Sequence, residues 1–119
     1  MKSQNQTTEE HKMIIFNMNE FINEFKRQCN ILYNSNEFIL TNSIFNVEYI
    51  PKKRSKLLML EEFYSIYNNY PEFVEEFIEY RGIEIKNNLE RIAFVLTIDQ
   101  LSSNNFYSPL DELTYHFKY

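Results

Sequence analysis

The sequence contains one glycine, one cysteine, three prolines and no tryptophan among its 119 residues. Tight turns with positive φ and phosphate-binding loops depend on glycine, so this scarcity excludes P-loop and dinucleotide-binding motifs and disfavours an all-β sandwich or barrel. Cys29 has no second cysteine to pair with, which excludes an intramolecular disulfide and a multi-cysteine metal site. We expect a protein of the reducing cytoplasm.

Long apolar runs are also missing. No stretch approaches the ~20 apolar residues that cross a bilayer, and residues 1–8 lack the apolar segment of a signal peptide. We therefore expect neither a membrane protein nor an exported one. Residues 1–8 are polar and are expected to be a flexible N-terminal segment. Residues 9–119 are expected to form a single globular helical domain, because 11 Phe and 9 Tyr supply a large apolar core.

The most apolar segment is 92–98, where only Thr97 is polar. A segment that is apolar on every side must be enclosed on every side, either as a central helix or as a buried strand. Ile85, Leu89, Ile92 and Leu96 recur at steps of four, three and four, which favours a helix over 84–101. The alternative is a buried strand, preceded by a turn at Asn87-Asn88, because β-branched and aromatic residues favour strands.

Four further helices are predicted. The first extends from about residue 9 to Tyr33, with Thr7 as N-cap and with Glu20 and Glu24 on its exposed side. A second covers about 57–67, and a third starts at Pro71 and ends before Gly82. The last covers about 110–117, after Ser108 as N-cap and Pro109 at the first position.

Residues 38–50 fit no helix clearly, because Phe45, Val47 and Tyr49 alternate with polar residues as in a half-buried strand. The predicted fold class is thus all-α, with about five helices in a compact bundle or short solenoid-like array and a minor β element near 38–50. The alternative is an α+β fold in which 92–98 is a buried strand.

Charge is distributed unevenly along a chain whose net charge is −5. Between residues 61 and 80 there are six acidic residues and no basic one, and these six are the predicted partner-binding residues: Glu61, Glu62, Glu72, Glu75, Glu76 and Glu79. The last four share one face of a helix. Like charges at these spacings repel by a few tenths of a kcal/mol per pair. Such a face suits a basic partner, although a merely solvated surface is an equally simple interpretation.

The chain also contains one short basic run, which consists of Lys52, Lys53, Arg54 and Lys56. It is a secondary candidate patch, for phosphate groups or for an acidic surface, and otherwise a charged loop. Because the rest of the chain is acidic, duplex DNA and anionic membranes are poor candidates as partners.

No catalytic constellation is evident. The only histidines, His11 and His116, lie near opposite ends of the chain, and Cys29 falls on the apolar stripe of the first predicted helix. The four-glutamate face has no Glu-x-x-His partner sequence, so no metal site is predicted. We expect neither enzyme activity nor a cofactor.

These patterns favour a small acidic cytoplasmic protein-binding module. The predicted role is that of an immunity or antitoxin-type protein, or a phage-type inhibitor, which neutralises a basic protein such as a nuclease toxin by direct binding. The alternative is a helical regulatory protein that contacts nucleic acid through the basic run at 52–56. The oligomeric state is left open.

Overall fold

The fold combines helices and strands. The computed structural model describes residues 11–42, 44, 47–102 and 112–119, and these contain four helices and four strands. In chain order they are β2 (His11–Asn17), α1 (Met18–Tyr33), β3 (Phe38–Asn42), β4 (Val47–Pro51), α2 (Arg54–Asn69), α3 (Pro71–Arg81), α4 (Asn88–Leu101) and β5 (Glu112–Lys118). The prediction of an all-α fold with about five helices is therefore wrong, because the chain folds as α+β.

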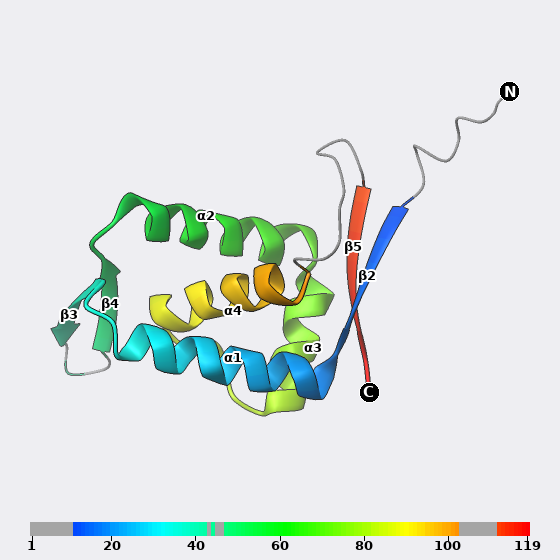
Figure 1. The fold of residues 1–119 in the computed structure, drawn as a ribbon, viewed down its shortest axis with the longest axis horizontal. Coiled ribbons are helices and arrows are strands. Elements are labelled where there is room, and N and C mark those ends of the chain that lie inside the picture. Colours follow the sequence, from blue (N-terminus) through cyan, green and yellow to red (C-terminus); the bar gives the residue numbers. More distant parts are fainter. Residues whose placement is uncertain (1–10, 43, 45–46, 103–111) are drawn as a thin grey trace, which may run out of the picture.

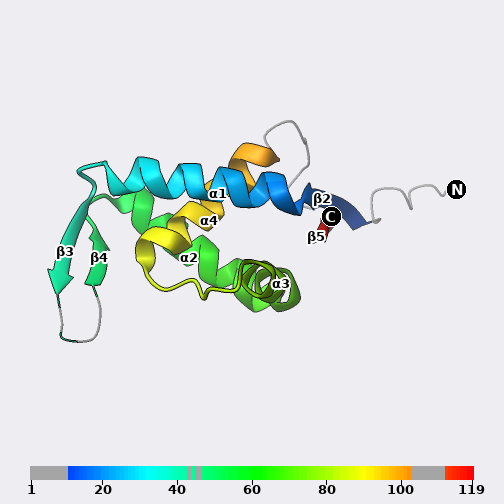
Figure 2. The same ribbon diagram turned by 90° about the horizontal axis from the view of Figure 1, so that it is seen from below.

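The helices occupy the middle of the molecule and the strands its two ends. Helix α4 lies between α1 and α2 (Figure 1). Helix α3 runs across one end of these three helices, next to β2 and β5. The β3–β4 hairpin projects from the opposite end, as Figure 2 shows from below. Among the described residues no helix is long and apolar enough to cross a bilayer.

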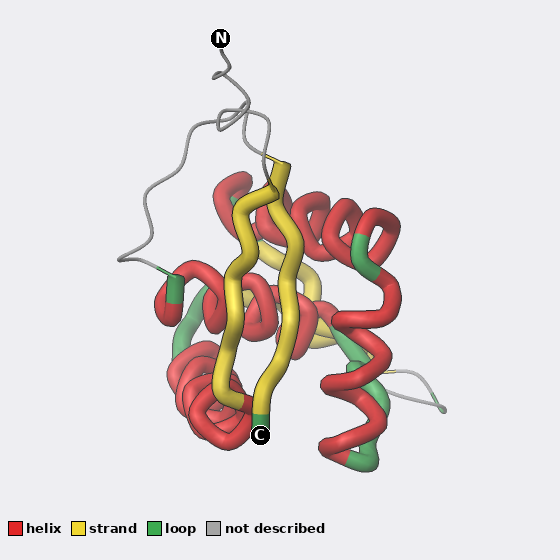
Figure 3. Tube along the Cα trace, turned by 90° about the vertical axis from the view of Figure 1, so that its right-hand side faces the viewer, coloured by secondary structure: helices red, strands yellow, loops and turns green. Residues whose placement is uncertain are grey.

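Residues 11–17 form a strand, although a helix was predicted from about residue 9. Strand β2 pairs in parallel with β5, so that Ile14 is opposite Tyr115 and Phe16 is opposite Phe117 (Figure 3). Ile14 and Phe16 are buried, whereas Met13 and Ile15 are exposed. Helix α1 begins at Met18, and the Asn17 side chain caps it by accepting a hydrogen bond from the Glu20 N–H at 2.9 Å. The predicted Thr7 cap and the flexible segment 1–8 lie outside the described residues.

The last predicted helix, over 110–117, is also replaced by a strand. The ring of Phe117 in β5 stacks on that of Phe73 in α3, with centroids 4.5 Å apart, and Tyr115 contacts the same ring at 5.3 Å. Alternate aromatic side chains thus attach β5 to the helices. The N-cap and the first residue predicted for that helix, Ser108 and Pro109, lie outside the described residues.

The apolar run 92–98 is helical and lies within α4, which begins at Asn88 rather than near Glu84. Asn87 provides the N-cap, since its side chain accepts from the Glu90 N–H at 2.9 Å. Every residue of 92–98 except Leu96 is buried. The alternative of a buried strand is therefore also wrong.

Phenylalanine rings from three helices surround Phe94 of α4, which is fully buried. Its ring centroid lies 5.3 Å from Phe21 of α1, 5.8 Å from Phe63 of α2, and 5.1 Å from Phe77 of α3. These contacts are edge-to-face, the arrangement that aromatic quadrupoles prefer. The core is thus an aromatic cluster shared by all four helices.

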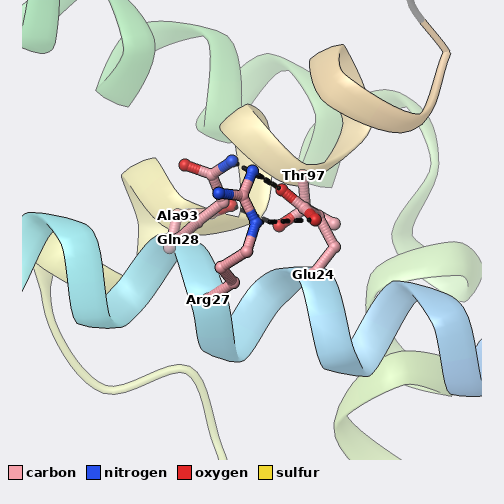
Figure 4. Close-up of polar contacts among 5 residues, drawn as sticks. All are labelled: Glu24, Arg27, Gln28, Ala93 and Thr97. Carbon is pink, nitrogen blue, oxygen red and sulfur yellow. Dashed lines mark hydrogen bonds and ion pairs between the residues drawn. The ribbon is translucent and has the colours of Figure 1, made fainter.

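Polar groups between α1 and α4 find partners locally (Figure 4). Glu24 accepts hydrogen bonds from Arg27 at 2.7 and 3.1 Å and from Gln28 at 2.7 Å, and the buried Thr97 hydroxyl donates to the Ala93 carbonyl at 2.7 Å. Glu24 was predicted to be exposed, yet only 14% of its side chain is accessible. Its ion pair with Arg27 makes that partial burial tolerable.

The boundaries of α3 are as predicted. Pro71 stands in the first turn, where its missing N–H has no partner to lose, and Gly82 follows the helix with φ of 79°. At the far end, Phe38, Tyr49 and Pro51 of the hairpin are buried, and the Asn88 amide donates to the Tyr49 carbonyl at 3.0 Å. Strands β3 and β4 thus form the β element expected near 38–50.

Candidate functional site

The four glutamates of α3 lie on its outer side. Glu72, Glu75 and Glu79 are exposed and Glu76 is half-buried. The opposite side of the helix carries the buried residues Phe73, Val74, Phe77 and Ile78. The helix therefore presents one apolar and one acidic side, as its sequence spacing predicts.

Tyrosines from other elements hold two of these carboxylates. The Tyr67 hydroxyl of α2 donates a hydrogen bond to Glu75, and the Tyr119 hydroxyl donates to Glu76. The Tyr119 ring lies against that of Tyr80 with centroids 5.4 Å apart. We call this set the acidic–tyrosine face; its members are Glu72, Glu75, Glu76, Glu79, Tyr67, Tyr80 and Tyr119.

The carboxylates also act on the tyrosines. The hydrogen bond to Glu75 raises the pKa of Tyr67, and the hydrogen bond to Glu76 raises the pKa of Tyr119 to about 12. Ionising either phenol would place a second negative charge beside a carboxylate. Both phenols therefore stay protonated at neutral pH and remain donors.

The ion pairs of the described part of the chain leave this face uncompensated. They join Arg27 to Glu24, Lys56 to Glu37 and Arg81 to Glu90. None of them involves a glutamate on the outer side of α3. The negative charge of the acidic–tyrosine face is thus available to a group from outside the described chain.

Glu61 and Glu62 are separated from this face. Both are exposed on α2, and the negative charge of Asp99 on α4 acts on Glu62. Desolvation by the surrounding protein atoms raises the pKa of Glu62, and the negative charge of Asp99 raises it further. The structure thus groups Glu62 with α4 and brings only four of the six predicted residues together.

The basic run is partly used inside the protein. The Lys56 ammonium lies 3.0 Å from a Glu37 oxygen with only 15% of its side chain exposed, and Lys52 donates to the Asn36 side chain at 3.2 Å. Lys53 and Arg54 are exposed at the start of α2. Two of the four bases therefore have internal partners.

Catalytic groups do not converge in the described residues. His116 is exposed on β5, and no three His, Cys, Asp or Glu side chains of this part come together as metal ligands. Burial raises the pKa of the half-buried Cys29 thiol to about 12, with the charge of Glu90 adding to the effect. That thiol is protonated at neutral pH and is a poor nucleophile.

Sequence reasoning missed the tyrosines of the acidic–tyrosine face. Tyr67 falls at the end of the helix predicted over 57–67 and was assigned no binding role there, and Tyr119 lies 43 positions beyond Glu76 in the chain. The abundance of tyrosine was the only sequence signal, and it does not say where the rings gather.

Comparison of the chain with protein-family models, curated proteins and solved structures found no match.

Proposed function

We propose that this protein is a protein-binding module that captures a basic partner through the acidic–tyrosine face of α3. Its role is that of an immunity or antitoxin-type protein or a phage-type inhibitor, which neutralises a partner such as a basic nuclease. We place that activity in the cytoplasm, consistent with a single cysteine, which can form no intramolecular disulfide.

The observation that carries the proposal is the combination of uncompensated carboxylates with ordered tyrosines. Tyr67 and Tyr119 fix Glu75 and Glu76 by hydrogen bonds, while Glu72 and Glu79 remain exposed on either side of them along the helix. Fixed side chains lose little conformational entropy on binding, and tyrosine is enriched among the residues that dominate interface energies. Exposed negative charge accelerates encounter with a positive surface.

The alternative function, nucleic-acid binding through residues 52–56, receives less support. Phosphate binding depends on the number of cations that release counterions. Lys56 is paired with Glu37, Lys52 is bonded to Asn36, and the charge of the exposed Lys53 also acts on Glu37. Most cations of this run are therefore engaged with other described residues. We therefore do not propose it.

Partner capture from the source cell tests the proposal. The wild-type protein is compared with Glu72→Gln/Glu79→Gln, which removes two exposed charges and no hydrogen bond of the described structure. The control is Thr41→Lys/Asn42→Lys, which changes the net charge by the same amount on the hairpin at the other end (Figure 1). Both variants should fold, since exposed substitutions usually change stability by less than ~0.5 kcal/mol.

Quantitative mass spectrometry then identifies proteins that the wild type and the hairpin control retain and that the glutamine variant loses. Such a protein should be basic, and purified partner should bind directly. Equal retention by all three forms would show that the acidic–tyrosine face is only solvated surface.

A further inference from the structure

A groove of about 490 Å³ lies where Arg81, the last residue of α3, meets α1 and α4. It is formed by α1, by the start of α4 and by residues from β4 and from the α3–α4 connection. Ile22, Phe25 and Leu89 supply apolar wall, and the charged residues that line it are Lys26, Arg81 and Glu90. Its volume is within the range of about 300–1,000 Å³ that is typical of small-molecule sites.

Arg81 is anchored at this groove by aromatic rings and by one carboxylate. Its guanidinium carbon lies 4.9 Å from the centroid of the Phe25 ring and 5.8 Å from that of Phe77. Its Nη2 donates to Glu90 at 3.2 Å, and only 14% of the Arg81 side chain is exposed. The planar group is therefore held in one orientation.

One end of this guanidinium has no partner. Arg81 Nη1 is buried and makes no hydrogen bond with any described residue. Glu90 does not supply it, because its other oxygen accepts from the Lys86 N–H at 2.8 Å. A buried charged donor without an acceptor is unfavourable, and a carboxylate is the acceptor that best matches guanidinium.

The charges around the groove favour an anion. Glu90 is neutralised by Arg81, so an amine would find no free counter-charge among the charged groups that line the groove. The exposed Lys26 ammonium adds a second positive charge at the same groove. An apolar wall combined with a net positive charge suits a ligand with an apolar body and a single acidic group.

We propose that this groove binds an amphipathic monocarboxylate, such as a medium-chain fatty acid or an arylacetic acid. Its carboxylate accepts a hydrogen bond from Arg81 Nη1 after a small side-chain adjustment and faces Lys26. Its hydrocarbon lies against Ile22, Phe25 and Leu89. This ligand site is independent of the protein-binding face on α3.

Binding of decanoate and of 2-naphthylacetate to the full chain, measured by calorimetry, tests the proposal against the alcohols with the same hydrocarbon. We expect each acid to bind at least about tenfold more tightly than its alcohol, a difference that one charge-assisted contact supplies. Lys26→Met should weaken both acids and leave the alcohols unchanged. Lys118→Met, the same exchange at an exposed position on β5, should affect neither.

Cys29 reports whether the ligand occupies this groove, because it lines the groove and is the only cysteine. Decanoate should slow its alkylation by iodoacetamide at alkaline pH, and should do so less in Lys26→Met. Arg81→Lys serves as a second test, since it keeps the charge but loses the planar donor pair, and it should weaken acid binding.

Three results would overturn the proposal: no binding of either acid at about 1 mM, equal binding of acids and alcohols, or binding that leaves Cys29 unprotected. Preferential binding of the alcohols would identify an apolar ligand instead. None of these outcomes bears on partner capture by α3, which is measured separately.

Discussion

Replacing Phe94 by alanine should remove a large part of the stability of this protein. Phe94 is fully buried in α4, and its ring contacts Phe21, Phe63, Phe73 and Phe77 with centroid distances from 5.1 to 5.8 Å. Truncating a buried Phe to Ala costs about 3–5 kcal/mol, from lost transfer free energy and from the cavity that remains. A domain of this size has only about 5–15 kcal/mol in total.

Urea unfolding followed by circular dichroism measures this loss. With a slope of about 1–3 kcal/mol per M, a loss of about 4 kcal/mol lowers the midpoint by about 1.3–4 M. Tyr64→Ala is the matched control, because Tyr64 is 53% exposed although its ring also contacts Phe63. Leu96→Ala should fall between the two, since Leu96 is half-buried. An unchanged midpoint for Phe94→Ala would show that the four helices do not meet at this ring.

Three other measurements follow from local contacts. Asn17→Ala removes the N-cap of α1 and should lower the free energy of unfolding by about 1 kcal/mol in the same urea assay, without changing its slope. The Arg27 hydrogen bond lowers the pKa of Glu24 below its ordinary value of 4.5, so the stability it contributes is complete above that value and is lost as the pH falls. Glu24→Gln should therefore be less stable than the wild type at neutral pH and should lose less stability on acidification; parallel pH profiles would contradict this. Cys29, with a pKa of about 12, should carry roughly 1,000-fold less thiolate at neutral pH than an ordinary thiol, so a thiol reagent should modify it far more slowly in folded than in urea-unfolded protein.

The helices were the predictable part of this fold, because their signals are local. Pro71 and Gly82 mark the two ends of α3, and the spacing of Leu89, Ile92 and Leu96 matches the helical period of α4. Asn17, which stands three residues before Glu20, also fits the sequence pattern of an N-cap, but Thr7 was predicted as the cap instead. Ile14 and Met18 are four positions apart, which matches the spacing of one helix face. The helical pattern of α1 was therefore wrongly extended into the residues of β2.

The two strands of the terminal sheet differ in how far the sequence predicts them. In β5, Leu113, Tyr115 and Phe117 alternate with polar residues, which is the pattern of a half-buried strand and was wrongly interpreted as a helix. In β2 no such pattern is visible. Met13 and Ile15 are apolar although they are exposed, so the alternation with the buried Ile14 and Phe16 does not show in the sequence. The pairing joins His11 to Glu112, about a hundred positions away, and local periodicity carries no information about such a partner.

The two candidate sites also differ in whether local sequence patterns can predict them. The glutamates of α3 share a face because of helical spacing alone, so their grouping could be predicted. The groove needs Lys26 of α1, Arg81 of α3 and Glu90 of α4 together, and only the tertiary fold does that. Glu24 was predicted to be exposed because helical spacing does not show that only 14% of its side chain is accessible, where it is paired with Arg27.

The association rate constant of the captured partner tests the central claim most directly. It is measured for the wild type, for Glu72→Gln/Glu79→Gln and for the hairpin control Thr41→Lys/Asn42→Lys, as the salt rises from about 0.05 M to about 0.15 M. If the acidic–tyrosine face guides the encounter, the wild-type rate should fall with salt, and the glutamine variant should associate several-fold more slowly than the control at low salt. Equal rates for the two variants, or a wild-type rate that does not change with salt, would contradict the account.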